Sequence, residues 1–244
     1  MAIEQHRKNR KLKFKKIPGR ASSKMNTIRV LVVILVIVPA VFYFTDPSAR
    51  MSFISFQLGQ ANEKLNRIQE AANNYDSSYK ESKKTNKKAQ LKHIEMLNRL
   101  NKWDQAVILA TDMANGNLQD EFLLSDVELE IGKANEGLGY EEDALVHYDK
   151  AAKLNGRNYD ALIGLGRMKR VKGDNTGSRK FLEDAVSLHN LRAPEAHYEM
   201  GLTYLAEGNG QDALEEFELT LSQLPGKELK EKASAKKIEI MGRT

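Results

Sequence analysis

The chain has 244 residues, and it contains no Cys. Disulfide frameworks and thiolate metal sites are therefore excluded. The net charge of +5 is unevenly distributed, because residues 1–29 carry ten Lys or Arg and a single acid, which leaves the other 215 residues with a net charge of −4. Such asymmetry is typical of a membrane-topology signal or of a nucleic-acid-binding tail.

Residues 1–27 predict a basic, disordered cytoplasmic tail. Basic residues occur throughout this segment, and Pro18 and Gly19 interrupt any helix. One interpretation is a tail that binds nucleic acid or acidic lipid, which salt-dependent binding of a peptide covering residues 1–26 would test. The other is a positive flank that orients a membrane span, and the next segment favours it.

Residues 28–45 predict a transmembrane signal-anchor helix. An uninterrupted apolar run extends from Val30 to Phe44 through Leu35, and it reaches about the lower length limit of a spanning helix. Pro39 introduces a kink that a membrane span tolerates. The alternative is a signal peptide cleaved near Pro39, but the long basic region before the run argues against it.

The positive-inside rule then predicts the orientation. The basic N-terminus stays in the cytoplasm, and the remainder of the chain lies on the other side of the membrane. We expect a single-pass protein of the bacterial inner membrane with a periplasmic domain. A protein of the mitochondrial inner membrane is the eukaryotic alternative.

Three segments between Gly132 and Pro225 share one skeleton. Each contains an apolar residue followed by Gly, then a Gly seven residues later, a small residue at twelve and an aromatic residue or Leu at sixteen. The three sets are Gly132, Gly139, Ala144 and Tyr148; Gly166, Gly173, Ser178 and Leu182; and Gly201, Gly208, Ala213 and Phe217. The first Gly of each set lies 34 or 35 residues from the next. A constant period of this size indicates stacked supersecondary units.

The skeleton has a physical interpretation. The first Gly lies inside a first helix and lets a second helix approach closely, and the second Gly ends the first helix in the left-handed conformation. The residue at sixteen fills the space between the two helices. The pattern resembles the tetratricopeptide repeat (TPR) family, whose signature is W-x2-L-G-x2-Y…A-x3-F…A…P, although the Trp position holds Glu128, Leu162 and His197. The resemblance implies an all-α solenoid of helix-turn-helix repeats.

The same frame extends towards the N-terminus. The frame positions, defined by the first Gly of each set, are Gly59, Ile94, Gly132, Gly166 and Gly201. The step of 38 residues between the second and third predicts a lengthened loop around Asn115 to Leu124. We therefore expect an array of about five repeats at residues 46–226. Residues 227–244 predict a C-terminal capping helix with a Lys-rich outer face, as the end of a solenoid requires.

The resemblance also implies an inner groove lined by the first helices. Three residues before the frame position stand Phe56, Leu91, Leu129, Ile163 and Tyr198, and the basic residues Lys133, Arg167 and Arg170 follow within one turn. The expected partner-binding groove therefore consists of Leu129, Lys133, Ile163, Arg167, Arg170 and Tyr198. It suits a hydrophobic peptide or an amphipathic helix with some negative charge. The family's Lys-Asn-Lys-Arg carboxylate clamp is absent as a set. The alternative is that the apolar residues pack only against neighbouring repeats.

Nothing in the sequence predicts catalysis. The five His residues fall in different segments without metal-ligand spacing, and the frame explains Gly166 of Gly164-Leu165-Gly166 without a dinucleotide loop. No nucleophile accompanies a base. We therefore expect a non-enzyme without catalytic residues, cofactor, metal or small-molecule substrate.

Two functions fit these features. The first is a membrane-tethered TPR scaffold that holds a protein partner near the inner membrane, because the architecture is similar to that of chaperone-like accessory proteins of the Sec export channel. The alternative is a structural subunit of a large envelope assembly, such as a secretion, pilus or motility apparatus.

Overall fold

The computed structural model describes residues 46–116, 118–188 and 192–242. Within these ranges the chain forms eleven α-helices and no strand, as the repeat pattern predicts. The predicted tail at 1–27 and the predicted span at 28–45 lie outside the described residues, which begin at Asp46. The helices are α3 (Pro47–Lys64), α4 (Ile68–Glu81), α5 (Lys87–Arg99), α6 (Trp103–Asn115), α7 (Glu121–Leu138), α8 (Glu141–Leu154), α9 (Tyr159–Val171), α10 (Asn175–Leu188), α11 (Pro194–Ala206), α12 (Gly210–Ser222) and α13 (Lys227–Met241).

The chain divides into two units, residues 1–50 and 51–244. In the first unit, the described residues form the first turn of α3. The Asp46 carboxylate caps this turn, because it accepts hydrogen bonds from the backbone N–H of Ser48 at 3.1 Å and from its hydroxyl at 2.8 Å. Among the described helices, none combines the length and the hydropathy that crossing a membrane requires.

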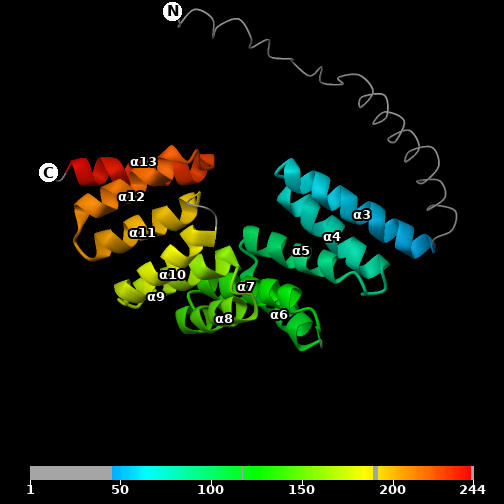
Figure 1. The fold of residues 1–244 in the computed structure, drawn as a ribbon. Coiled ribbons are helices and arrows are strands. Elements are labelled where there is room, and N and C mark those ends of the chain that lie inside the picture. Colours follow the sequence, from blue (N-terminus) through cyan, green and yellow to red (C-terminus); the bar gives the residue numbers. More distant parts are fainter. Residues whose placement is uncertain (1–45, 117, 189–191, 243–244) are drawn as a thin grey trace, which may run out of the picture. The chain divides into compact units, whose positions relative to one another are not determined.

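The second unit is built from helix pairs in chain order (Figure 1). In all five pairs the second helix begins nine residues after the frame position. Consecutive helices from α4 to α13 pack against one another, and the first helices also contact each other, α5 with α7, α7 with α9 and α9 with α11. The first helices of repeats two to five therefore share one surface.

The turn inside each pair depends on a left-handed residue seven positions after the frame position. Gly139, Gly173 and Gly208 have φ angles of 79°, 80° and 76°, as predicted for a helix that ends at Gly. In the first two repeats Asn66 and Asn101 take this place, with φ angles of 56° and 57°. Asn tolerates this region better than other side chains do, so all five turns have the same geometry.

The frame glycines are required by close helix approach. A Cβ atom on Gly132 would lie 2.7 Å from a ring carbon of Tyr148, and one on Gly201 would lie 2.7 Å from a ring carbon of Phe217. Repeat two reverses the sizes, because its frame residue is Ile94 and the residue sixteen positions later is Ala110, which is fully buried. A large residue at one position thus goes with a small residue at the other.

A similar exchange involves the family's Trp position and the residue nineteen positions later, which face each other across each pair. The three pairs are Glu128 with His147, Leu162 with Phe181, and His197 with Glu216. The His Nδ1 lies 2.5 Å from the Glu carboxylate in the first pair and 2.7 Å in the third, where acid and base have exchanged helices. Between them, repeat four pairs two apolar residues, both in its packed interior. Repeats three to five therefore each satisfy this buried position with their own complementary pair.

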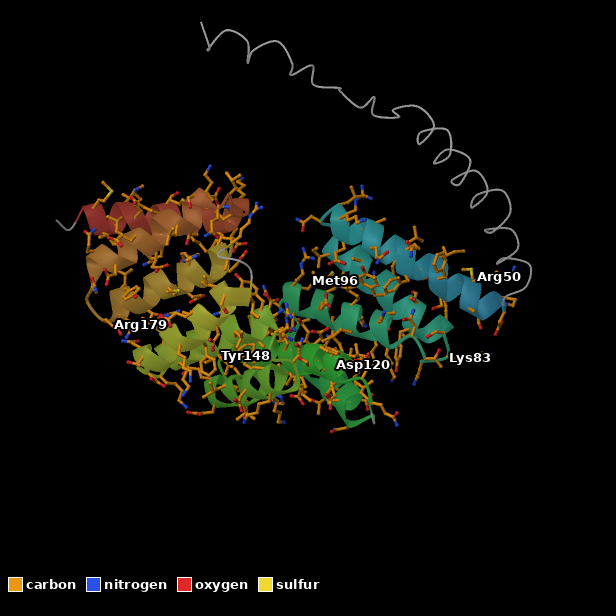
Figure 2. The ribbon with its side chains drawn as sticks, in the orientation of Figure 1. Arg50, Lys83, Met96, Asp120, Tyr148 and Arg179 are labelled. Atoms are coloured by element: carbon orange, nitrogen blue, oxygen red, sulfur yellow. The ribbon has the colours of Figure 1, made fainter. Side chains whose placement is uncertain are left out.

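The lengthened loop predicted around Asn115 to Leu124 is wrong. The connection between α6 and α7 covers residues 116–120, which is as long as the connection between α4 and α5. α7 instead has 18 residues, whereas α5, α9 and α11 have 13 each. It begins eleven residues before its frame position and the others begin seven before theirs, so four of the added residues lie at its N-terminal end. Four residues add about one turn at 3.6 residues per turn, so the longer helix keeps its buried face. Asp120, labelled in Figure 2, starts this turn and accepts hydrogen bonds from the N–H groups of Phe122 and Leu123.

At the C-terminal end, α13 packs against α12. Ala233 is its buried residue, and the Lys237 ammonium donates a hydrogen bond of 2.6 Å to Glu218. Lys227 and Lys230 lie on the surface of this helix.

The exchange of sizes at the frame position gives a testable consequence. Gly201→Ile should destabilise the full chain by ~1–3 kcal/mol, because the new side chain overlaps the Phe217 ring. The double variant Gly201→Ile with Phe217→Ala copies Ile94 and Ala110 and should recover part of this loss. Chemical unfolding followed by circular dichroism measures both. A double variant that is less stable than Gly201→Ile alone would show that the two sizes are not coupled.

Candidate functional site

Two adjoining grooves lie along the first helices of the second unit. The large groove has a volume of about 710 Å³, and it is lined by α5, α7, the α8–α9 loop and the start of α9. The small groove has a volume of about 280 Å³, and it is lined mainly by α9, α11 and α13. Lys133 and Asp160 line both grooves, so one continuous surface joins them.

The structure places five of the six predicted groove residues in these two cavities. Leu129 and Lys133 line the large groove, whereas Lys133, Ile163, Arg167 and Tyr198 line the small one. Arg170 lines neither groove.

The apolar members form the floor of the grooves. Leu129 is only 7% exposed and Ile163 only 6%, and each also belongs to a core cluster. Tyr198 is half-buried, with its ring centroid 5.6 Å from that of Phe217. These side chains therefore contribute to packing between repeats as well as to the groove surface.

The basic members are paired with acids from neighbouring helices. The Lys133 ammonium lies 2.9 Å from the Glu130 carboxylate and 3.3 Å from that of Asp160. Arg167 bridges two repeats, because its guanidinium lies 2.8 Å from Glu136 of α7 and 3.3 Å from Glu199 of α11. The basic residues of the predicted groove therefore take part in a series of ion pairs.

Arg170 belongs to the same series of ion pairs. Its guanidinium lies 2.8 Å from Glu199, the acid that also faces Arg167. Across α5 and α7, the Asn98 amide donates hydrogen bonds to the backbone carbonyl of Glu130 at 2.9 Å and to its carboxylate at 2.7 Å.

Sequence reasoning missed these acidic partners, although two signals point to them. Glu130 and Lys133 are three residues apart on one helix, as are Lys92 and Glu95, and this spacing places opposite charges side by side. Asp126, Asp160 and Glu195 recur six residues before the frame position, in the second turn of α7 and the first turns of α9 and α11. Acids in a first turn are favoured by the helix dipole, and all three acids line the grooves.

The groove environment shifts the pKa values of several of its ionisable groups. Burial alone would lower the pKa of Lys133 and of Arg167, but their carboxylate neighbours outweigh burial and raise both pKa values. Burial raises the pKa of Glu95, and the nearby Lys92 opposes this rise.

A buried tyrosine connects the groove to the core in the third repeat. Tyr148, labelled in Figure 2, is almost fully buried, and its hydroxyl donates a hydrogen bond of 2.6 Å to Glu136. Burial and the Glu136 charge raise the pKa of Tyr148 far above its ordinary range. Its ring lies against Gly132 of its own repeat and Gly164 of the next, where an added Cβ would lie 2.7 Å from the ring in either case. This contact explains Gly164, which the repeat frame alone does not.

The first repeat uses the same arrangement. The Tyr75 hydroxyl donates a hydrogen bond of 2.7 Å to Glu63, and both residues hold the same frame positions as Tyr148 and Glu136.

Among the residues that the structure describes, no group of His, Asp and Glu has the arrangement of a metal site.

The Lys133 ion pairs predict a pH-dependent effect on stability. Lys133→Met leaves Glu130, which is 4% exposed, without its cation. A fully buried broken pair costs ~3–5 kcal/mol, and we expect a smaller loss of ~1–3 kcal/mol because the Lys133 side chain is 37% exposed. Since the folded state raises the pKa of Lys133, the stabilisation is complete below the ordinary value of 10.5 and is lost as the pH rises through the folded value.

Urea unfolding of the wild type and of Lys133→Met between pH 7 and 11 measures the difference in their free energies of unfolding. The matched control is Glu130→Gln with Lys133→Met, which removes both charges and should be more stable than the single variant. Equal stability of the single variant and the wild type at pH 7 would contradict a structural role for the pair.

Comparison with known proteins agrees with the repeat assignment. No protein-family profile matches the sequence, and no curated protein matches it. Solved structures do match. The TPR protein TTC0263 of Thermus thermophilus is 20% identical with a TM-score of 0.62, and the match covers 76% of this chain and 98% of that one.

Two further structures extend the comparison. PilW, described as a widely conserved type IV pilus biogenesis factor, is 15% identical with a TM-score of 0.62, and the match covers 85% of this chain and 92% of PilW. YrrB, described as a TPR protein with an unusual peptide-binding site, is 16% identical with a TM-score of 0.51, and the match covers 74% and 90% of the two chains. Together with the helix pairs and their glycine frame, these likenesses show that the chain has the fold of the tetratricopeptide repeat proteins.

Proposed function

We propose that this chain is a membrane-tethered TPR interaction scaffold on the periplasmic side of a bacterial inner membrane. It holds a partner protein near the membrane, in a chaperone-like role beside the export channel. The observation that carries the proposal is the pair of grooves that share Lys133 and Asp160. Their floor is apolar, and their walls present polar groups from three or more repeats, which is the arrangement of a surface that binds an extended or helical segment.

The charges of the large groove indicate the chemistry of the partner. Four basic side chains and four acidic side chains line it: Lys92, Arg99, Lys133 and Arg157, with Glu95, Asp126, Glu130 and Asp160. Because the charges balance, a purely acidic segment would have to displace existing ion pairs. The two grooves together fit an amphipathic segment that places apolar side chains on Leu129, Ile163 and Tyr198 and charges of both signs against the walls. Its binding should depend only weakly on salt.

The membrane part of the proposal is supported by the sequence alone. The apolar run from Val30 to Phe44 follows ten basic residues, and it ends within three residues of Pro47, where α3 begins. A helical array with so short a connection stays close to the bilayer. The mitochondrial inner membrane is the alternative location.

A structural subunit of a large envelope assembly is the second candidate. The observation that favours it is the likeness to PilW, which covers most of both chains. A scaffold that exchanges partners and a permanent subunit differ in one measurable property. The subunit would purify in a complex of fixed stoichiometry, whereas the scaffold would be recovered mostly without its partner.

Site-directed crosslinking tests the groove. The chain has no Cys, so one introduced Cys can carry a photoreactive group at a single position. Arg157→Cys and Leu229→Cys place the group at the large and the small groove, and we expect both to crosslink the same protein. The matched controls are Ile108→Cys and Val146→Cys, which are exposed positions on second helices outside both grooves and should give no such product.

A second measurement shows whether the floor supplies affinity. Tyr198→Ala removes the half-buried ring and should weaken binding of the identified partner about 10–30-fold, since a hot-spot side chain contributes ~2 kcal/mol. Equal crosslinking from the control positions, or unchanged affinity of a folded Tyr198→Ala variant, would place binding elsewhere on the chain.

Fusions to topology reporters test the membrane orientation. An enzyme that works only outside the cytoplasm should be active when fused after Thr244 and inactive when fused after Ser23, because the basic tail stays inside. The reverse pattern would exclude the periplasmic location. Recovery of a soluble domain that begins near Val41 would instead identify a cleaved signal peptide.

A further inference from the structure

The first helix of the array exposes a face that every later repeat buries. In repeats two to five, the residue five positions before the frame position is fully buried: Ala89, Val127, Ala161 and Ala196. The residues one before and two after the frame position lie on the same side of the helix. In repeat three these are Ile131 and Ala134, and both are buried. These side chains meet the second helix of the preceding repeat, as the cluster of α6 and α7 residues shows.

In α3 the equivalent positions are Ile54, Leu58 and Ala61, which are apolar but not buried. Ile54 is half-buried, Ala61 is exposed, and Leu58 is 51% exposed although its counterpart Leu165 is 2% exposed. Met51 continues the same side of α3 towards its N-terminus, and Leu65, the first residue after the helix, continues the spacing at the other end; both are exposed. Since α3 has no preceding helix within residues 51–242, this interior-type face stays uncovered in the described part of the second unit.

We propose that this stripe, made of Met51, Ile54, Leu58, Ala61 and Leu65, binds the same stripe of a second copy of this chain in a parallel pair. Its residues follow one another at intervals of three, four, three and four, which is the spacing of a seam between two helices. A lipid surface or a groove would not require this register. The second copy would cover the stripe with a helix, although this helix would run parallel to α3 and not antiparallel as between consecutive helices of the array.

The borders of the stripe favour a second copy over a foreign helix. Ser55, Gln57 and Asn62 flank it and are uncharged, and the charged neighbours Arg50 and Lys64 stand near its two ends. Identical stripes can therefore meet in parallel with like charges level only at the ends, whereas a distinct partner is usually selected by complementary charges along the flanks. The parallel direction rests on the proposed function, because two copies inserted in one membrane carry α3 away from it in the same direction.

Cysteine crosslinking of the full chain in isolated membranes tests this pairing. Leu58→Cys and Leu65→Cys should each form a disulfide-linked homodimer when an oxidant is added. The matched control is Phe53→Cys, which is 60% exposed on the same helix but lies about 140° from Leu58 at ~100° per residue, and it should remain monomeric. Equal crosslinking at Phe53 would overturn the proposal, as would a product of Leu58→Cys whose mass shows a different protein.

A second variant keeps the test independent of crosslinking. Leu58→Glu places a charge on the stripe at an exposed position, so it should leave helix content unchanged and halve the mass of the detergent-solubilised protein. Phe53→Glu should leave the dimer intact. A monomeric wild type would overturn the proposal. This is the result expected if the stripe is inserted into lipid. Failure of the pairing can be distinguished from failure of the proposed function. The pairing is tested by disulfide formation and mass at positions in α3, whereas groove binding and membrane orientation are tested at other positions.

Discussion

The contact between the frame position and the side chain sixteen residues later controls how closely the two helices of each repeat approach. Gly with Tyr, Leu or Phe and Ile with Ala give the same helix pair, because their combined size fills the same space. The exchange of His197 and Glu216 relative to Glu128 and His147 follows the same principle with charge in place of size. Complementarity is therefore satisfied within each repeat, which explains how the repeats diverge in sequence while the fold persists.

Much of this fold could be predicted because its signals are local. A glycine, a left-handed turn and a large side chain at fixed steps describe one helix pair without knowledge of its neighbours. The step of 38 residues was misinterpreted because four more residues fit equally well in a loop or in one helical turn, and only the capped start of α7 at Asp120 decides between them. The left-handed conformations of Asn66 and Asn101 were missed because only Gly was expected at a positive φ.

The site was less predictable because its charges depend on contacts between repeats. The frame identified Leu129, Lys133, Ile163, Arg167 and Tyr198 as neighbours of the grooves, and the cavities contain them. It could not show that Asp160 reaches Lys133 or that Glu199 reaches Arg167, since these partners are about 30 residues apart in the chain. The difference changes the expected partner from an apolar segment with some negative charge to an amphipathic segment with charges of both signs.

Tyr148 couples two repeats that a linear array would otherwise leave separate. Its ring lies between Gly132 and Gly164, and its hydroxyl reaches Glu136, which also faces Arg167 of the next repeat. Opening of the fourth repeat would therefore expose the ring and release the ion pair of the third at the same time. In a solenoid whose stability is a sum of nearest-neighbour terms, so strong a term makes repeats three and four one cooperative block. Amide hydrogens of α7 to α10 should then exchange with solvent together and more slowly than those of the terminal helices.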